Sequence, residues 1–469
     1  MSKYSKKIVI VGGGVAGINA ATKLVDNGYP GHLITIIDMG KDPYKRQPEE
    51  VMTGFAGAGL FSDGKWVYLH NTIGGQLAKY TGEGKANELI EEGLEIIKRF
   101  HPDPTKIMFS NPKEEPNFIK PYFNLRMAPT YHIGTNYLID LGKNWYNYLV
   151  KKGINFIWES TVVDIDFDEN VIYYHENLDW DDQHEIFYGK LIFGTGKSGI
   201  NLTQKLIGEY NLKKEPKSVQ IGVRMELPQK YMQPIVDISY DFKLYQKPTP
   251  KISLRTFCSN NNAAYVAEEE TYGMKSYNGH SFKQENMVNN MTNFGIIMEI
   301  KEIDNPFQFQ KEIVEKCQIK EIYSYNLKSY DLTLKGIFSK GEGNIVQKGL
   351  YYSPNKTRKP TLSSENKELN VYQLESLDIF KESYGKYSDY ITNFISDLDK
   401  VFHFGDDYGI YIPEVKYLSE EVLVNYEDLS LIDYPNIHFV GDALSSRGIA
   451  VSACQGLLCV EKIINDRDL

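Results

Sequence analysis

The fold of this chain is decided close to its first residue, by the stretch Ile8-Val9-Ile10-Val11-Gly12-Gly13-Gly14-Val15-Ala16-Gly17. Its four leading β-branched residues predict a buried parallel strand. Gly12 permits a tight turn, Gly14 lets the backbone approach a pyrophosphate, and Gly17 lets the next helix pack on the strand. Val15 and Ala16 open that helix, whose free N–H groups and dipole favour phosphate. The stretch therefore predicts a dinucleotide-binding site.

A second predicted strand, Leu33-Ile34-Thr35-Ile36-Ile37, leads into Asp38 about twenty residues after Gly17. An acid at this place accepts hydrogen bonds from ribose hydroxyls, so we expect Asp38 and its neighbour Met39 to contact the cofactor. Strand, glycines, helix, strand and acid follow in order within ~30 residues, which favours a ligand site over a chance glycine cluster. Asp38 also disfavours a 2′-phosphate, so NADP is not expected at this site.

A matching pattern closes the chain, where Ile437-His438-Phe439-Val440 predicts a strand that leads into Gly441 and Asp442. This strand can return to the N-terminal sheet, which predicts a discontinuous domain and a cofactor as long as FAD. We expect Gly441 and Asp442 to lie by the ribityl hydroxyls or the pyrophosphate.

A helix-like run follows, starting at Gly448 and Ile449. Its first amides can face the flavin pyrimidine oxygen, where the helix dipole favours the negative charge of reduced flavin. Arg447 can add its charge to that effect, or it can contact a phosphate or the substrate.

The composition is typical of a globular protein, and 469 residues are enough for two or three domains. The formal net charge is −10. No long basic run is present, so a nucleic-acid partner is not expected. The four cysteines contain no CxxC pair, which disfavours a disulfide scaffold and a redox-active pair. No run approaches the ~20 apolar residues of a membrane span, and no HExxH or acid cluster predicts a metal. We expect a cytoplasmic protein.

A glycine-rich segment, Gly54-Phe55-Ala56-Gly57-Ala58-Gly59-Leu60-Phe61-Ser62-Asp63-Gly64-Lys65, suits close approach of backbone to a planar ligand. The alternative is a mobile surface loop, which would more often carry serine and acidic residues. The expected cofactor contacts here are Gly57, Gly59, Ser62, Asp63 and Lys65. Arg46, just before the segment, either faces the cofactor phosphates or is a solvated arginine.

The hexapeptide Gly194-Thr195-Gly196-Lys197-Ser198-Gly199 fits the GxGxxG pattern after a predicted strand, Lys190 to Phe193. It could form a second dinucleotide site for NAD(P)H, but no complete βαβ unit follows it. We favour a turn that completes the FAD domain, with Gly194, Thr195 and Gly196 near the cofactor.

The middle of the chain predicts a helix over Tyr137 to Lys151 and strands over residues 154–158 and 161–165. From about residue 215 onward, β-branched and aromatic runs predict an antiparallel, mixed sheet. Residues 302–400 contain two predicted loop or insertion segments, Glu342 to Leu350 and Asn355 to Glu368, before an amphipathic helix over Tyr387 to Phe402.

Three residues of the β-rich region are candidates for catalysis. Arg224 lies on the same strand face as Glu226, which suits either a pocket or a cross-strand ion pair. Cys258, close to Arg255, is either a reactive thiol or an inert buried residue. His280, in the predicted turn Asn278-Gly279-His280-Ser281, could be an acid/base group or a solvated histidine.

Several of these motifs together resemble a family of FAD-dependent dehydrogenases of the FSDGK-loop type, within the glutathione-reductase-like flavoprotein group. The motifs that carry the resemblance are GAGLFSDGK, His132-Ile133-Gly134-Thr135-Asn136-Tyr137, Ile221-Gly222-Val223-Arg224-Met225-Glu226, Arg255-Thr256-Phe257-Cys258, Asn278-Gly279-His280-Ser281 and Ser446-Arg447-Gly448-Ile449. The resemblance implies FAD, redox chemistry and a backbone contact near Val163 with the adenine ring. The chain departs from the family pattern after Cys258, where Ser259 to Ala264 replace an expected glycine-containing turn.

The predicted fold class is α/β, with a discontinuous, doubly wound FAD-binding Rossmann-type domain and a β-rich mixed-sheet substrate domain. The predicted boundaries are 1–214 for the first part of the FAD domain (with 50–130 as cofactor loop and insertion), 215–405 for the substrate domain, and 406–469 for the closing segment. The expected function is hydride transfer between FAD and a small organic substrate, as a dehydrogenase or reductase. A flavin-dependent monooxygenase and a non-catalytic FAD-binding or partner-binding protein are the alternatives. The motifs specify neither the electron donor or acceptor nor the oligomeric state.

Overall fold

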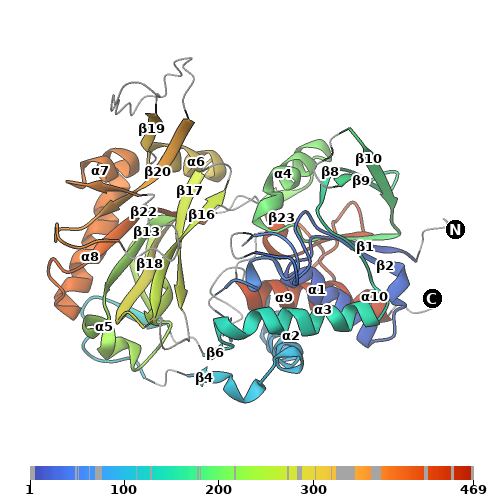
Figure 1. The fold of residues 1–469 in the computed structure, drawn as a ribbon, viewed down its shortest axis with the longest axis horizontal. Coiled ribbons are helices and arrows are strands. Elements are labelled where there is room, and N and C mark those ends of the chain that lie inside the picture. Colours follow the sequence, from blue (N-terminus) through green and yellow to red (C-terminus); the bar gives the residue numbers. More distant parts are fainter. Residues whose placement is uncertain are drawn as a thin grey trace. The chain divides into compact units, whose positions relative to one another are not determined.

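The structure, a computed structural model, divides into two compact units, which are drawn in Figure 1. Unit 1 comprises Met1–Phe109, Pro129–Lys217 and Ser419–Leu469, and unit 2 comprises Ser110–Ala128 and Ser218–Leu418. The residues that the structure describes are 6–47, 50, 52–62, 64–68, 77–111, 114–126, 129–176, 179, 181–215, 218–271, 274–281, 288–301, 303–317, 319–323, 344–360, 371–416, 421–444 and 448–465.

A five-stranded parallel sheet forms the centre of unit 1, with the strand order β24-β11-β1-β2-β7. Its strands are β1 (Ile8–Val11), β2 (Ile34–Ile37), β7 (Asn155–Ile157), β11 (Lys190–Phe193) and β24 (Ile437–Phe439). All residues of β1 and β2 are buried, as expected for β-branched runs in a parallel sheet that is covered on both faces. Strand β24, from the end of the chain, pairs with β11, so the C-terminal segment completes the sheet.

Helices α1 (Val15–Asp26), α9 (Ile449–Cys459) and α3 (Leu138–Lys151) gather on one face of this sheet (Figure 1). The indole Nε1 of Trp145 on α3 donates to the Thr22 hydroxyl on α1 at 2.7 Å, which fixes the two helices together. The opposite face carries α4 (Ile200–Glu209) and a three-stranded antiparallel sheet, β10-β9-β8 (Figure 1). The predicted α/β fold with a discontinuous Rossmann-type domain is confirmed.

The remaining elements of unit 1 are short strands and outer helices. They are β3 (Lys65–Val67), α2 (Leu77–Phe100, interrupted at Gly82), β4 (Met108–Ser110), β6 (Thr130–His132), β8 (Ser160–Asp166), β9 (Val171–Glu176), β10 (Gln183–Phe187), β12 (Lys214–Glu215), β23 (Glu421–Val422) and α10 (Glu461–Asn465).

Unit 2 is built on a nine-stranded sheet, which is mostly antiparallel. Its order is β19-β20-β22-β13-β18-β15-β14-β5, and β21 pairs with β20. The strands are β5 (Asn124–Arg126), β13 (Val219–Pro228), β14 (Lys243–Thr249), β15 (Ile252–Asn262), β18 (Met291–Ile300), β19 (Ile319–Tyr323), β20 (Asn344–Tyr352), β21 (Val371–Leu374) and β22 (Gly409–Val415).

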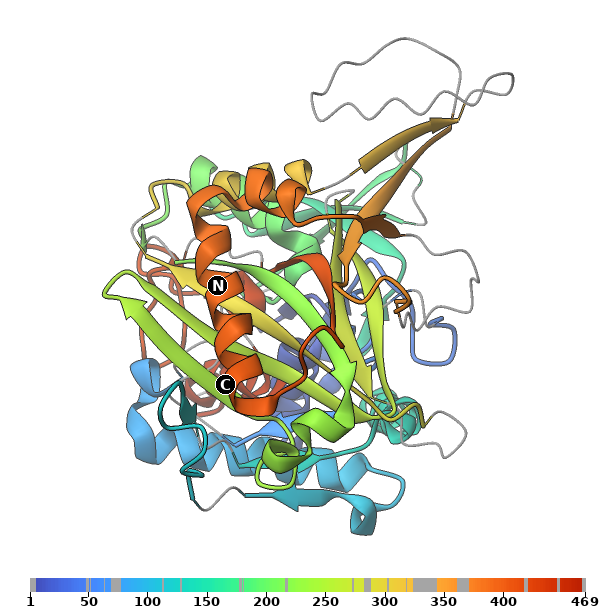
Figure 2. The ribbon, with the colours of Figure 1, turned by 90° about the vertical axis from the view of Figure 1, so that its left-hand side faces the viewer.

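One face of the nine-stranded sheet is apolar and covered by helices α5 (Gln229–Val236), α6 (Pro306–Lys316), α7 (Asp378–Tyr384) and α8 (Ser388–Phe402). Figure 2 shows α8, in orange, lying across the strands. Ile391, Phe394 and Leu398 of α8 pack with strand residues such as Val223 and Ile296 in one core, so the predicted apolar stripe of this helix is confirmed. The hairpin β16 (Ala264–Thr271) and β17 (Met274–Ser281) contributes Val266 and Tyr277 to a separate small cluster with Tyr351 and Tyr411.

Two expectations about the β-rich region are wrong. Asn278 to Ser281 are not a turn but lie in β17, where His280 pairs with Tyr265. Gly279 is needed within this strand, because a Cβ there would lie 1.7 Å from the Arg224 guanidinium and 2.2 Å from the Asn260 amide. Glu342 to Leu350, expected as a loop, largely form β20. Helices α6 and α7 were not predicted.

The unit boundaries also differ from the expected domain boundaries. Residues 110–128 belong to unit 2, where β5 extends the nine-stranded sheet, whereas the sequence placed 50–130 with the FAD domain. Unit 2 also continues to Leu418, because β22 is a central strand of its sheet.

Candidate functional site

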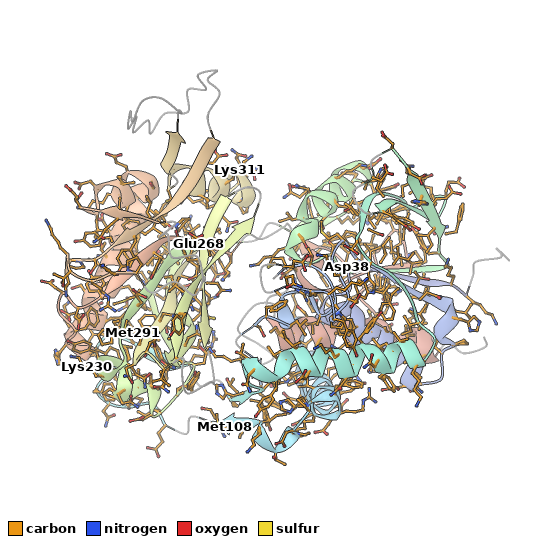
Figure 3. All side chains as sticks on the ribbon, viewed as in Figure 1. Asp38, Met108, Lys230, Glu268, Met291 and Lys311 are labelled. Carbon is orange, nitrogen blue, oxygen red and sulfur yellow. The ribbon has the colours of Figure 1, made fainter. Side chains whose placement is uncertain are left out.

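A cavity of about 180 Å³ lies in unit 1 where the parallel strands end at their carboxyl edge. Ligands bind at this edge in open α/β sheets, because the loops there leave a crevice and the following helices present their N-termini. Asp38, at the end of β2, is labelled in Figure 3. The residues that line the cavity are Gly14, Val15, Ala16, Asp38, Met52, Ala56, Gly57, Ala58, Gly59, Gly194, Thr195, Gly196, Lys197, Ser198, Gly441, Asp442, Gly448, Ile449 and Ser452.

The glycines between β1 and α1 have three distinct functions. Gly12 has a φ of +105°, and a Cβ there would lie 2.3 Å from the Gly194 oxygen. Gly17 packs the helix on the turn, since its Cβ would lie 2.2 Å from the Gly12 oxygen. Gly14 differs, because a Cβ at this position would meet nothing within 4 Å and would project into open space. Gly12 and Gly17 therefore shape the turn, and Gly14 keeps the cavity clear beside the N-terminus of α1.

The Asp38 carboxylate holds three loops together. Its Oδ2 accepts a hydrogen bond from Gly13 N at 2.7 Å, and its Oδ1 accepts from Gly40 N at 2.8 Å and Gly54 N at 2.6 Å. The side chain is half-buried and lines the cavity. Asp38 therefore both presents a carboxylate to the cavity and ties the first glycine-rich turn to the second.

The segment from Gly54 to Gly59 lies directly against the α1 turn. Ala56 N donates to Gly13 O at 2.8 Å, and Ala56 and Gly14 form a parallel bridge. Gly57 has a φ of +49°, and a Cβ there would approach the Gly14 Cα to 3.3 Å. The glycine-rich segment, which was expected beside a ligand, thus lines the cavity.

Arg46 differs from both alternatives considered for it, because it is a buried residue, 6% exposed, that lies outside the cavity lining. Its guanidinium donates to the carbonyl oxygens of Phe55 at 2.5 Å, Gly57 at 2.9 Å and Glu50 at 2.5 Å. Burial lowers the pKa of Arg46 to about 10, and the negative charges of Asp38 and Glu50 partly offset this. Arg46 therefore supports the cavity by holding the glycine-rich segment in place.

The closing segment brings a second helix N-terminus to the cavity. Gly448, with a φ of 97°, caps α9, and Ile449 and Ser452 of that helix line the cavity. Gly441 N donates to Gln455 Oε1 at 2.8 Å, which fixes the loop that carries Asp442. Helices α1 and α9 therefore both direct backbone N–H groups and positive dipole ends toward the same cavity.

The loop after β11, Gly194 to Ser198, lines the same cavity as the first turn. Thr195 Oγ1 is buried and has no hydrogen-bond partner among the described residues. Lys197 brings a positive charge to the lining. The position of this loop supports a turn of the FAD domain rather than a second dinucleotide site.

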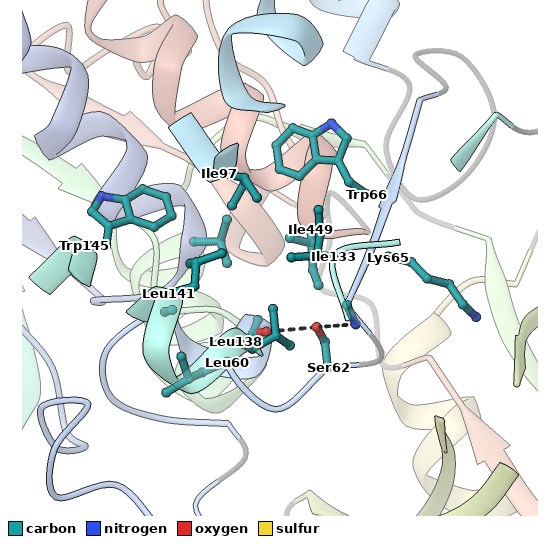
Figure 4. A pocket seen from close by; sticks show the side chains of 14 residues that line it. Leu60, Ser62, Lys65, Trp66, Ile97, Ile133, Leu138, Leu141, Trp145 and Ile449 are labelled. Atoms are coloured by element: carbon teal, nitrogen blue, oxygen red, sulfur yellow. Dashed lines mark hydrogen bonds between the residues drawn. The ribbon is translucent and has the colours of Figure 1, made fainter. Parts of the chain in front are cut away.

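An adjoining apolar cavity of about 40 Å³ begins at Val15, Ala56, Gly59 and Ile449, which line both spaces. Figure 4 shows its apolar wall, which includes Leu60, Trp66, Ile97, Ile133, Leu138, Leu141 and Trp145. Ser62 closes the turn here, since its hydroxyl donates to Gly59 O at 2.9 Å and accepts from Gly64 N at 3.2 Å. Lys65 also lines this cavity and is 7% exposed, and Figure 4 shows its side chain directed away from the apolar cluster.

Four predicted contacts lie elsewhere or beyond the described part of the chain. Met39 is 45% exposed and lies outside the cavity lining. Val163 also lies outside the lining, at a bulge of β8 between Val162 and Asp164 where the register with β9 shifts. A bulged residue leaves its backbone unpaired in the ladder, which is what a backbone contact with a base requires. Asp63 and Arg447 are outside the described residues.

Sequence reasoning missed several lining residues. Ala56, Ala58, Lys197 and Ser198 lie in the glycine-rich segments within two residues of predicted contacts, and Ser452 lies one turn into α9. Their position next to those contacts could have revealed them. Met52 carries no comparable pattern, because only the folding of its loop against the α1 turn brings it to the cavity.

The three catalytic candidates lie in unit 2, and Arg224 is completely buried there. Its guanidinium donates to Asn293 Oδ1 at 2.9 Å and to Cys258 O at 2.8 Å, and it lies 3.4 Å from Glu414 Oε2. Burial by itself lowers the pKa of Arg224, but the attraction of Glu414 and the interactions with Cys258 together raise it above the ordinary value. Arg224 therefore forms a buried cross-strand ion pair with Glu414, and Glu226 is buried as well.

Cys258 is partly exposed and has a positive φ of 50° at a bulge of β15. Its thiol lies 3.8 Å from Asn278 Oδ1, and the Asn260 amide donates to its carbonyl oxygen at 2.9 Å. The backbone of His280 lies in β17. All four cysteines are free thiols; Cys317, Cys454 and Cys459 are buried, and burial raises the pKa of each.

The residues of the cavity fit a dinucleotide with a flavin. Gly14 leaves room for a pyrophosphate, two helix N-termini supply N–H donors, and the Thr195 hydroxyl has no partner of its own among the described residues. The half-buried carboxylates of Asp38 and Asp442 suit ribose and ribityl hydroxyls. The fold and the cavity together define a flavoprotein with an FAD-binding Rossmann-type unit.

Comparison with known families agrees with this class. Residues 6–230 match the family described as pyridine nucleotide-disulphide oxidoreductase, a match that covers a little less than half of the chain. FAD is therefore indicated as the cofactor, and the chain is a flavoprotein of oxidoreductase type. A search of the curated proteins finds no match.

Solved structures similar to this chain are distant in sequence. One is a flavoprotein/dehydrogenase from Cytophaga hutchinsonii, with 11% identity, a TM-score of 0.42, and coverage of 99% of this chain and 80% of that chain. CmlS, a flavin-dependent halogenase, has 10% identity and a TM-score of 0.40, and the match covers 100% of this chain and 60% of that chain. The halogenase PltM has 10% identity and a TM-score of 0.37, with 99% and 69% covered.

Two features are absent from the part of the chain that the structure describes. No helix in that part of the chain combines the length and apolar composition needed to cross a bilayer. The same residues contain no group of three or more His, Cys, Asp or Glu side chains arranged to hold a metal ion.

Proposed function

We propose that this protein is an FAD-dependent dehydrogenase or reductase that moves a hydride between bound flavin and a small organic substrate. The observation that supports this most strongly is the cavity at which α1, α9 and the ends of four parallel strands converge. The resemblance of the Gly54 to Lys65 segment to the FSDGK-loop type also supports a dehydrogenase, because Gly57 and Gly59 of this segment line the cavity.

Each part of the cavity has a distinct role in this proposal. The amides of α1 beside Gly14 would bind the pyrophosphate, and Asp38 would accept hydrogen bonds from the adenosine ribose. Asp442 would serve the ribityl hydroxyls or the pyrophosphate, and the amides that open α9 would polarise the flavin pyrimidine ring. When bound, FAD supplies two-electron redox chemistry, and the protein supplies position and electrostatics.

We infer that unit 2, residues 110–128 and 218–418, recognises the substrate, because the cavity of unit 1 suits the cofactor. Chemistry through a pair of cysteines is not part of this proposal. Cys317, Cys454 and Cys459 are buried free thiols with raised pKa values, which disfavours the thiolate form that such chemistry requires.

The test is to purify the chain, identify the bound flavin after release by mass spectrometry, and titrate it anaerobically with NADH, NADPH and candidate metabolites. We expect stoichiometric FAD, and bleaching of the visible flavin absorbance by at least one reductant. A protein that neither retains nor rebinds FAD would refute the cofactor assignment. Retained FAD that no reductant bleaches would support a non-catalytic FAD-binding protein instead.

A further inference from the structure

On the face of the nine-stranded sheet opposite the helices, one row of polar side chains runs across β5, β14 and β15. Tyr245 on β14 pairs with Arg255 on β15, and Asn124 on β5 pairs with Tyr245. Arg126 is two residues beyond Asn124 on the same strand, so it shares the face with Tyr245 and Arg255. Two arginines and a phenol are therefore collected at one edge of this sheet.

Neither arginine forms a hydrogen bond or an ion pair within the part of the chain that the structure describes. Arg126 is exposed, whereas Arg255 is half-buried and its Nε is fully buried without a hydrogen-bond partner. Burial lowers the pKa of Arg255, and the positive charge of Arg126 lowers it further, although Glu299 and Tyr245 oppose this. Leaving a half-buried guanidinium beside a second positive charge is unfavourable unless an anion binds there.

Glu299 is the carboxylate that partly offsets the lowered pKa of Arg255, but it does not lie directly opposite Arg255 in the sheet. It pairs across the strands with Ser253, one side-chain step along β15, and it accepts a hydrogen bond from the Ser218 hydroxyl at 2.6 Å. Lys243, which pairs with Arg126, already has a carboxylate partner, since it lies 2.6 Å from Asp241 Oδ2. Among the described residues, the positive charges without an ion-pair partner at this edge are thus those of Arg255 and Arg126.

We propose that Arg255 and Arg126, assisted by the Tyr245 hydroxyl, bind the oxyanion group of the substrate, a carboxylate or phosphate on a small organic molecule. The planar guanidinium fork matches two oxygens of such a group, and charge-assisted hydrogen bonds are the stronger ones. This inference rests on the proposed function, because it names the substrate class of the same enzyme.

The test measures anion binding to the purified FAD-loaded protein by calorimetry, using benzoate, succinate and inorganic phosphate as probes in low-salt buffer. We expect saturable binding of at least one probe, weakening as salt increases. Comparing the affinities for benzoate and succinate with the affinity for phosphate shows whether the site prefers a carboxylate or a phosphate. Absence of binding by all three probes would overturn the proposal.

Variants then locate the site. Arg255→Gln should weaken binding of the effective probe about tenfold or more, and Arg126→Gln several-fold, with melting temperature and FAD content unchanged. Arg255→Lys should bind with intermediate affinity, because it keeps the charge and loses the fork. Lys381→Gln is the charge-matched control, since Lys381 is exposed on α7 on the helix-covered side. The proposal fails if Arg255→Gln binds like the wild type, or if Lys381→Gln loses as much affinity.

The two proposals can fail separately. FAD content is measured from the flavin absorbance, and anion binding is measured from heat. A protein that binds the probes through Arg255 but contains no FAD would overturn the proposed function alone. A protein that holds FAD and ignores the anions would overturn this inference alone.

Discussion

Gly456 on α9 packs against Ala16 on α1 so closely that a Cβ at position 456 would lie 2.0 Å from the Ala16 oxygen. This contact joins the two helices whose N-termini open onto the cavity, although they come from opposite ends of the chain. The spacing between the two helix N-termini therefore depends on the absence of a side chain at one position.

Gly456→Ala should separate α1 from α9. We expect a loss of about 1–3 kcal/mol in the free energy of unfolding, typical of overpacking, together with weaker FAD binding. Thermal denaturation and flavin titration measure the two effects. Gly208→Ala in α4 is the matched control, since a Cβ there meets nothing within 4 Å. It should lower neither the free energy of unfolding nor the affinity for FAD. Equal behaviour of the two variants would contradict the packing argument.

Gly14→Ala should separate cofactor binding from stability. The new methyl group projects into open space and the backbone φ of −67° is acceptable for alanine, so the melting temperature should stay close to that of the wild type. FAD affinity should fall about tenfold or more, which corresponds to about 1.4 kcal/mol, because the methyl group occupies the space expected for the pyrophosphate. Gly17→Ala should instead impair folding, as its Cβ would meet the Gly12 oxygen at 2.2 Å. Unchanged FAD affinity in Gly14→Ala would place the pyrophosphate elsewhere.

Asp38→Ala and Asp442→Ala should both yield protein with reduced flavin content. Asp38→Ala should also lower the melting temperature, because it leaves the amides of Gly13, Gly40 and Gly54 without their acceptor. The absorbance ratio of flavin to protein after purification, and the melting curves, measure these changes. Full flavin occupancy in both variants would contradict the assignment of the cavity.

His438, on β24, should make stability depend on pH below about 6.5. Burial lowers its pKa below the ordinary value near 6.5, while its Nδ1–H donates to Asp428 O at 2.8 Å. The unfolded chain therefore takes up the proton first, so stability is present above about pH 6.5 and is lost as the pH falls, by up to about 1.4 kcal/mol per unit.

His438→Asn keeps a donor toward Asp428 O and removes the titration. Melting temperatures measured from pH 5 to pH 8 should fall less steeply with acid in this variant than in the wild type. Identical slopes would show that another group causes the acid sensitivity.

The cofactor unit was largely predictable because its pattern is local. Ile8 to Gly17 specify strand, turn and helix through β-branched residues and glycines that allow few alternatives, and Asp38 follows at the expected distance. The turn predicted at Gly279 was wrong for a non-local reason. Glycine there makes room for Arg224 and Asn260 from other strands, and a single segment of sequence does not reveal those neighbours.

The role of Arg46 also depends on contacts that the local sequence does not reveal. Its place before a glycine-rich segment suggested either a phosphate contact or a solvated side chain, but the structure buries it under three carbonyl oxygens of its own chain. Such contacts depend on how the loop closes, so residue type and spacing alone do not determine them.

The sequence by itself determined the strand-turn-helix at each end of the chain and pointed to Gly14, Asp38 and Asp442, which line the proposed cofactor cavity, because these features follow from local backbone geometry. The tertiary structure alone decided that Gly456 brings α9 against α1, that Arg46 supports the glycine-rich segment, and that Arg255 and Arg126 share one face of the sheet. These relationships join residues far apart in the chain, and close packing and strand pairing create them only when the whole unit folds.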